Sequence, residues 1–169
     1  LWVMSRHMLK GFNRALFCAW AAAVLSKRKS KSDEQICDAF IAGLSHDIGL
    51  LFIPPVSSAD NQELNPEAWD LIQRHPEIGY DLLSFMPSMP NPVSRAVMEH
   101  HEEMDGSGYP AGKVGKQLGP LGRLIHLLDS IHAIYTKYFQ PRGRTLADMI
   151  PIIQMNQLSS PGQPGADLI

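Results

Sequence analysis

The sequence predicts an all-α domain. Helix start signals are frequent along the chain, whereas no segment alternates apolar and polar residues over any useful length. With 169 residues, of which 44% are hydrophobic, the chain can form one domain with a sizeable core. We expect the domain to cover residues 1–158. Residues 159–169 are rich in Ser, Pro and Gly, and we expect them to form a disordered tail or linker.

The first predicted helix contains the longest apolar run of the chain, the eleven residues 15–25. This run is well below the roughly 18 residues that a membrane span requires, so we expect a buried helix and no span. The second helix begins at a capping box formed by Ser32 and Gln35, and it ends at His46 and Asp47. Its apolar residues fall on one helical stripe: Ile36, Phe40, Ile41 and Leu44.

Three further helices are predicted from proline start signals. Pro66 begins a helix that stops before His75, and Pro76 begins the next one. Pro92 opens a helix over residues 93–101, which places a histidine doublet in its last turn. The core-facing residues of that helix are expected to be Val93, Ala96 and Val97.

The last helix is predicted over about residues 120–138, after a glycine-rich loop at 102–117. Asp129 lies near the middle of this helix. Its expected buried face consists of Leu121, Leu124, Ile125, Leu128, Ile131 and Ile134.

Charge and cysteine content restrict the partners and the compartment. A net charge of -2 and a pI of about 6.4 give no general attraction to anionic lipid or nucleic acid, so we expect no DNA or RNA partner. Cys18 and Cys37 are expected to be reduced core thiols in a cytoplasmic protein. The chain opens at Leu1 and lacks signal-peptide features, so we interpret it as a fragment of a longer protein.

Histidine and aspartate recur in an order that indicates a metal site. Imidazole nitrogen and carboxylate oxygen suit iron, manganese, zinc or nickel, and one carboxylate can bridge two ions. A single histidine on an apolar helix is more often a hydrogen-bonded core or surface residue, so His7, His126 and His132 are left outside the site. The candidate ligands are His46, Asp47, His75, His100, His101 and Asp129.

The most specific segment is His100-His101-Glu102, followed by Asp105-Gly106-Ser107-Gly108-Tyr109-Pro110. Together with the earlier pair His46-Asp47, this segment resembles the HD-GYP family of HD-superfamily metal-dependent phosphohydrolases. The resemblance covers about residues 32–134. The resemblance implies an HD-domain helical bundle with a metal site between helices, in the bacterial cytoplasm. It also implies hydrolysis of cyclic di-GMP to pGpG or GMP by a metal-activated hydroxide. The implied cofactors are one or two divalent transition metals, iron or manganese first, with nickel or zinc as alternatives.

The resemblance also assigns roles to individual residues. Asp47 would be the catalytic, bridging carboxylate, with His46 and Asp129 on a first metal. The second metal would be held by His75, His100 and His101. Tyr109 and Arg123 would bind substrate.

The loop motif of the family consists of Asp105, Gly106, Gly108, Tyr109 and Pro110. We expect its two glycines to adopt positive backbone angles close to the metal pocket. In the family this loop is implicated in docking GGDEF-domain proteins, and an upstream regulatory domain is expected in the full-length protein.

The chain departs from the family pattern at several positions. Leu50 stands where relatives carry a lysine, and residues 9–14 lack the histidine and the glutamate that relatives supply from the first helix. His132 replaces a second aspartate, while Arg142 and Arg144 lie at shifted positions. These departures predict a mononuclear or weakly binuclear centre. They leave open a degenerate module that binds a ligand or docks GGDEF domains without turnover, and a phosphohydrolase of the broader superfamily that acts on a mononucleotide.

Overall fold

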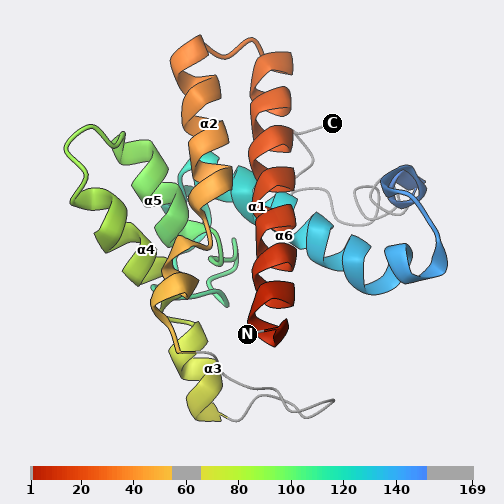
Figure 1. Ribbon diagram of the computed structural model, residues 1–169. Helices are drawn as coiled ribbons and strands as arrows, with labels where there is room; N and C mark the ends of the chain where they lie inside the picture. The colour runs from red at the N-terminus through yellow and green to blue at the C-terminus, as the bar shows by residue number, and fades with distance from the viewer. Residues whose placement is uncertain (1, 55–65, 152–169) are drawn as a thin grey trace.

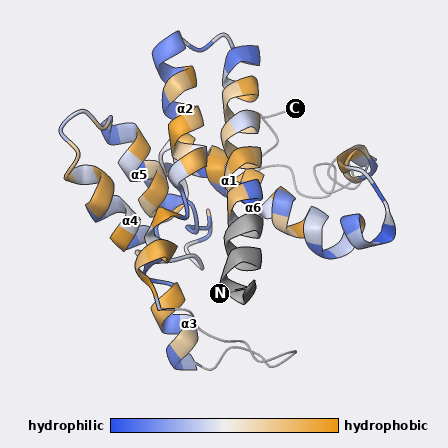
Figure 2. Ribbon diagram, viewed as in Figure 1, coloured by the Kyte–Doolittle hydropathy of each residue, from blue (hydrophilic) through white to orange (hydrophobic). Residues whose placement is uncertain are grey.

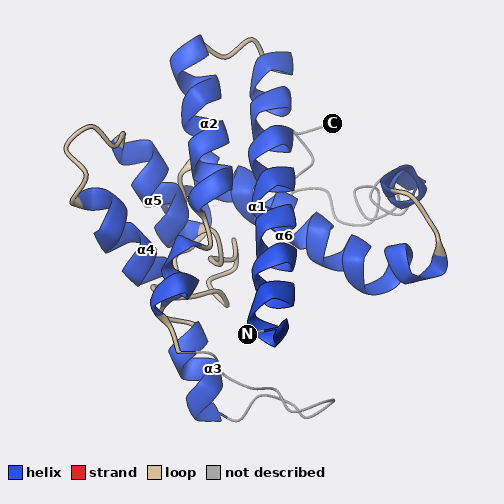
Figure 3. Cartoon of the chain, in the orientation of Figure 1, coloured by secondary structure: helices blue, strands red, loops and turns tan. Residues whose placement is uncertain are grey.

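The computed structural model describes residues 2–54 and 66–151, with side chains from residue 11 onward. Within this part of the chain Figure 3 shows helices and loops and no strand, which confirms the all-α prediction. One isolated antiparallel bridge joins Asp105 to Val114. The predicted tail at 159–169 and the side chain of His7 lie outside the described residues, so the domain boundary at residue 158 stays a prediction.

Two long helices, α1 (Trp2–Arg28) and α2 (Asp33–Ser45), run side by side in opposite directions (Figure 1). The predicted capping box starts α2: the backbone N–H of Gln35 donates to Ser32 Oγ, and the backbone N–H of Ser32 donates to Gln35 Oε1, both at 3.2 Å. The two helices approach closely at Gly43, where a Cβ atom would overlap the backbone of Ala19. This close approach brings the end of α2 against the middle of α1.

The remaining helices agree with the proline signals to within a residue or two. They are α3 (Pro66–Ile72), α4 (His75–Ser84), α5 (Asn91–Glu99) and α6 (Pro120–Ile134). The predicted last helix continues past α6 as a π-helical segment, η3 (Tyr135–Phe139). Short 3-10 segments complete the described chain: η1 (Ile48–Phe52), η2 (Gly115–Gln117), η4 (Gln140–Arg142) and η5 (Leu146–Met149).

The core lies where α1, α2, α5 and α6 meet, and Figure 2 shows hydrophobic residues concentrated along these helices. Val93, Ala96 and Val97 of α5 are buried, as predicted. The core also contains Cys18, Ala22, Ala39, Ala42, Ile125 and Leu128. None of the helices in the described ranges is long and apolar enough to cross a membrane.

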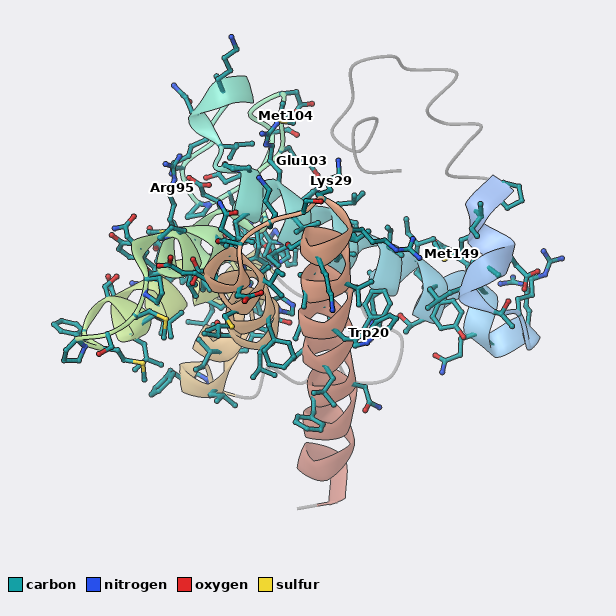
Figure 4. The ribbon with its side chains drawn as sticks, turned by 90° about the horizontal axis from the view of Figure 1, so that it is seen from above. Trp20, Lys29, Arg95, Glu103, Met104 and Met149 are labelled. Carbon is teal, nitrogen blue, oxygen red and sulfur yellow. The ribbon has the colours of Figure 1, made fainter. Side chains whose placement is uncertain are left out.

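The prediction that the 15–25 run is a buried helix is wrong for two large residues. Leu16 is 41% exposed and Trp20 is 64% exposed, and Figure 4 shows Trp20 projecting outward from α1. The interface between α1 and α2 is instead built from small residues such as Ala19, Ala42 and Gly43. Because these helices pack so closely, large side chains do not fit between them.

The same cause explains the burial pattern of α2. The buried face of α2 consists of Ala39, Ala42 and Gly43, whereas Phe40 and Leu44 of the predicted stripe are more than 40% exposed. Two further expectations were wrong. Cys37 is an exposed free thiol rather than a core thiol, and Ile134 at the end of α6 is 45% exposed because it lies beyond the packed part of the helix.

Candidate metal centre

His46 and Asp47 lie where α2 ends, as the sequence predicts. His46 is the C-cap residue of α2 and is fully buried. Its Nδ1 lies 2.7 Å from the carbonyl oxygen of Gly43. Because a carbonyl oxygen can only accept, Nδ1 carries a proton, and Nε2 is the ring atom that faces the pocket. This Nε2 is buried and makes no hydrogen bond within the described part of the chain.

The same backbone contact orients His75, which starts α4, and His100, which caps α5. Nδ1 of His75 donates to the carbonyl oxygen of Ile72, and Nδ1 of His100 donates to that of Val97, both at 2.7 Å. The two Nε2 atoms lie 3.1 Å apart and 3.3 and 3.5 Å from Asp47 Oδ1. Lone pairs this close repel unless a proton or a cation lies among them, and the donor set suits a divalent transition metal.

His101 completes this group. One donor atom from each of Asp47, His75, His100 and His101 lies within 4.8 Å of the others. The His101 ring stacks on Tyr109, with centroids 4.8 Å apart and planes at 25°. Burial, reinforced by the neighbouring imidazoles of His100 and His75, lowers the pKa of His101 to about 2, so its ring stays neutral and can act as a ligand.

Asp47 lies between this group and a second one. Nε2 of His46 is 3.4 Å from Asp47 Oδ2 and 3.4 Å from Oδ1 of Asp129, which is buried on α6. Oδ1 of Asp47 therefore faces the imidazoles of His75 and His100, and Oδ2 faces that of His46. Bridging of two ions by Asp47, which the resemblance assigns, stays a prediction. Although burial raises the pKa of Asp47, the rings of His100 and His75 hold it well below its ordinary range, so the carboxylate is ionised.

The second group contains two residues that sequence reasoning missed. Donor atoms of Cys18, His46 and Asp129 lie within 4.8 Å of one another. The Nε and Nη2 atoms of Arg14 donate to the two carboxylate oxygens of Asp129. Burial, followed by the charge of Asp129, raises the pKa of Cys18 to about 12, so the thiol is protonated. The available signal was the spacing of Arg14 and Cys18, which places both on one face of α1.

The loop after the doublet departs from the predicted backbone at one glycine. Asp105 accepts hydrogen bonds from the backbone N–H and the hydroxyl of Ser107, at 2.9 and 2.7 Å, and Gly106 has the predicted positive φ of 85°. Gly108 does not have a positive φ, so that expectation was wrong. A glycine is needed there because a Cβ atom would overlap the backbone of Glu103. The reason is close packing rather than backbone conformation.

Tyr109 ties the loop to the histidine doublet. Its backbone N–H donates to the carbonyl oxygen of His101 at 3.1 Å, in addition to the ring stacking. The peptide bond between Tyr109 and Pro110 is cis. Tyr109 is thereby placed against the candidate ligand His101, beside the pocket in which the resemblance assigns it to substrate binding.

Two buried glutamates hold the loop in place, and neither was assigned a role from the sequence. Glu102 accepts hydrogen bonds from the backbone N–H groups of Ala111 and Lys113, at 2.7 and 2.8 Å. Glu99 accepts from the Lys113 ammonium at 2.8 Å and from the backbone N–H of Gly119 at 2.7 Å. A carboxylate on the buried face of α5 was the signal for Glu99, because such a group needs partners.

Other candidate residues lie outside the two donor groups. Arg123 is in the first turn of α6, and its buried Nε makes no hydrogen bond within the described residues. No described contact links it to the ligands, so substrate binding by Arg123 stays a prediction. His126 donates from Nδ1 to the carbonyl oxygen of His100 at 3.0 Å, and half-buried His132 is in neither group. Arg142 donates to a backbone carbonyl on the surface.

The family of the chain follows from its match to the HD domain model over residues 4–160. The chain belongs to the HD domain family. It is 31% identical over 134 residues to cyclic di-GMP phosphodiesterase PA4108 of Pseudomonas aeruginosa, covering 79% of this chain and 32% of that protein. It is also 31% identical over 114 residues to the cyclic di-GMP phosphodiesterase response regulator RpfG of Xanthomonas campestris pv. campestris, covering 67% and 30%. These similarities support the assignment of an HD-GYP domain.

The fold of this HD domain is shared with Bd1817, a solved HDG"Y"P protein from Bdellovibrio bacteriovorus. The two superpose with a TM-score of 0.65 at 18% identity, covering 90% of this chain and 48% of that one. The predicted HD-domain helical bundle is thereby confirmed. The candidate ligands come from α2, α4, α5 and α6 and the residues that follow them, so the site lies between helices. The aligned part of the chain spans about a third of the curated relatives.

Proposed function

We propose that this HD domain is a metal-dependent phosphodiesterase that hydrolyses cyclic di-GMP to pGpG or GMP. The observation that carries the proposal is the position of the Asp47 carboxylate, whose two oxygens face imidazoles of two separate groups. A largely buried, ionised carboxylate in such a position binds cations well. The names of the relatives support the choice of substrate.

The residues that would hold a divalent metal are Asp47, His75, His100 and His101. When bound, such an ion lowers the pKa of water and neutralises charge on a phosphodiester. The backbone contacts at Nδ1 keep the imidazoles oriented before any ion arrives, so little reorganisation is needed. Iron and manganese are the proposed metals, with nickel or zinc as alternatives, because all four accept nitrogen and oxygen ligands.

The chemical step is the addition of water to the phosphorus of one phosphodiester. The P–O bond to the ribose oxygen breaks, and that oxygen receives a proton, which gives a linear dinucleotide. Asp47 is ionised and can accept a hydrogen bond from the attacking water. Tyr109 and Arg123 are proposed to contact the substrate; the unpartnered, buried Nε of Arg123 supports a phosphate ligand.

Hydrolysis of cyclic di-GMP is the test of this proposal. The purified domain is loaded anaerobically with iron or manganese, and the linear product is followed by chromatography. We expect turnover in the wild type and in Asp70→Asn, a control on the exposed face of α3, and none in Asp47→Ala. Equal product in the wild type and Asp47→Ala would contradict a metal centre built on Asp47.

A second candidate is a module that keeps the fold and docks a partner or ligand without turnover. The observation that favours it is Leu50, an apolar residue beside the His-Asp pair where the family carries a lysine. Absence of product at high enzyme concentration, together with saturable binding of cyclic di-GMP, would select this candidate. Docking of GGDEF-domain proteins, an upstream regulatory domain and a cytoplasmic location belong to the full-length protein and stay proposals.

A further inference from the structure

Helix α1 brings a cation of the protein itself into the candidate metal centre. The Arg14 guanidinium donates through Nε and Nη2 to both oxygens of Asp129, and its Nε lies 4.0 Å from Asp47 Oδ2. The Asp129 side chain is only 6% exposed, and that of Arg14 is 30% exposed. A two-pronged contact of this kind, largely removed from water, is the strongest form of a guanidinium–carboxylate pair.

This contact conflicts with a metal ion in the same place. An ion coordinated by His46 and Asp129 needs an oxygen lone pair toward which an Arg14 N–H now points. The ion would also place its two positive charges next to the charge of the Arg14 guanidinium in a largely buried pocket. The charge of the Asp129 carboxylate is already compensated by the Arg14 guanidinium, which contacts both of its oxygens.

We propose that Arg14 is a built-in cation that takes the position of a first metal, so that this HD domain carries a single ion, in the group of Asp47, His75, His100 and His101. This inference rests on the proposed metal-dependent function for that one ion only. The protein keeps the carboxylate of Asp129 and the imidazole of His46, but the Arg14 guanidinium neutralises the carboxylate internally.

Cys18, one helical turn after Arg14 on α1, offers a third donor atom to the position that Arg14 occupies. Its thiol falls within 4.8 Å of the donor atoms of His46 and Asp129. Removal of the guanidinium would leave one sulfur, one nitrogen and one oxygen donor around a buried cavity with excess negative charge. This donor set suits zinc or iron, and metal binding would release the thiol proton.

The number of metal ions bound per chain tests the inference without any substrate. Each protein is loaded anaerobically with excess zinc, desalted, and analysed by elemental mass spectrometry. We expect one ion per chain in the wild type and in Asn13→Ala, an exposed control on the same helix, and two in Arg14→Ala. Arg14→Gln, which has similar length and no charge, serves if Arg14→Ala does not fold. Adding Cys18→Ser to the Arg14 variant should return the count to one.

Two outcomes would overturn the inference: two ions in the wild type, or one ion in folded Arg14→Ala and Arg14→Gln. A manganese-loaded sample gives an independent readout, since the wild type should show the electron paramagnetic resonance of an isolated ion rather than a coupled pair. No ion in the wild type would instead refute the metal centre and the proposed function with it. Loss of hydrolysis with one ion bound would refute only the proposed function.

Discussion

The Nε2 atoms of His75 and His100 lie 3.1 Å apart, although each ring already donates its Nδ1 proton to a backbone carbonyl. In their neutral forms the two rings therefore turn lone pairs toward each other, beside an oxygen of Asp47. Burial, which is the largest influence, lowers the pKa of His100, so a proton shared between the rings is disfavoured. A divalent ion bound here would relieve this repulsion, and metal binding would then stabilise the fold.

Metal should stabilise the domain against unfolding through these two rings. At a metal concentration a hundredfold above Kd, we expect the free energy of unfolding to rise by about 2.7 kcal/mol, and a chelator to reverse the gain. Thermal unfolding with and without metal measures it. His100→Ala should lose the metal-dependent shift in Tm, whereas Asp70→Asn should keep it. A shift of unchanged size in His100→Ala would show that the metal binds elsewhere.

Tyr109 should influence metal affinity through His101, because the two rings stack at 4.8 Å. Groups that orient a metal ligand are worth about tenfold to a hundredfold in affinity. We expect Tyr109→Ala to weaken metal binding about tenfold and Tyr109→Phe, which keeps the ring, to leave it nearly unchanged. Competition with a chromophoric chelator measures both variants. Equal weakening in the two would assign the effect to the hydroxyl and contradict a stacking role.

Sequence patterns predict the helices of this domain well because their start signals are local. The Ser32 capping box and the proline at the start of α3 act within one helical turn, so they can be recognised without a structure. Burial was predicted less well. Whether Phe40 or Trp20 faces the core depends on how closely α1 and α2 approach, and that distance is set by small residues on both helices.

In the candidate site, too, the residues with a sequence signal of their own were predicted, and those that depend on packing were not. The histidines and aspartates predicted as ligands do come together, because ligand types in a characteristic order carry their own signal. The residues that sequence reasoning missed act through contacts between distant segments. Arg14 reaches Asp129 across 115 positions of the chain, and Glu99 anchors the start of α6. Such partners cannot be recognised until the packing of α1 and α5 against α6 is known.

Glu99 should make stability depend on pH. Although burial raises the pKa of Glu99, hydrogen bonds from Lys113, Arg95 and Gly119 hold it below its ordinary range. A lowered pKa means that the ionised form stabilises the fold above the unfolded value of about 4.3, and that this gain is lost as pH falls through the folded value. We expect Glu99→Gln to cost about 2 kcal/mol at neutral pH.

The measurement is the free energy of unfolding by urea for metal-free wild type and Glu99→Gln at several pH values. The difference between the two should be largest at neutral pH and should narrow below about pH 4, because the wild-type glutamate then becomes protonated. Glu67→Gln on the exposed surface of α3 is the matched control. A difference that stays constant down to pH 3 would rule out ionisation of Glu99 as its cause.

Leu50 offers the most direct test of catalysis, because it lies three residues after Asp47 in η1 and is 38% exposed. The turn is held by a backbone contact, in which the N–H of Leu50 donates to the carbonyl oxygen of Asp47. Because the side chain takes no part in this contact and is partly exposed, a longer side chain can be accommodated without changing the turn. A lysine there would place a positive charge near the pocket. One such electrostatic contact to a transition state is worth roughly 3 kcal/mol, or about a hundredfold in rate.

We therefore expect Leu50→Lys to raise the turnover of cyclic di-GMP up to about a hundredfold. Leu51→Lys, at the next position of the same turn and 70% exposed, adds the same charge facing solvent and should change little. The comparison uses kcat at saturating substrate with equal metal content in all three proteins. A gain confined to Leu50→Lys would show a catalytic centre weakened by one substitution. No gain, together with undetectable wild-type activity, would contradict the enzyme hypothesis, because the added charge would have no reaction to accelerate. The docking module would then be the remaining candidate.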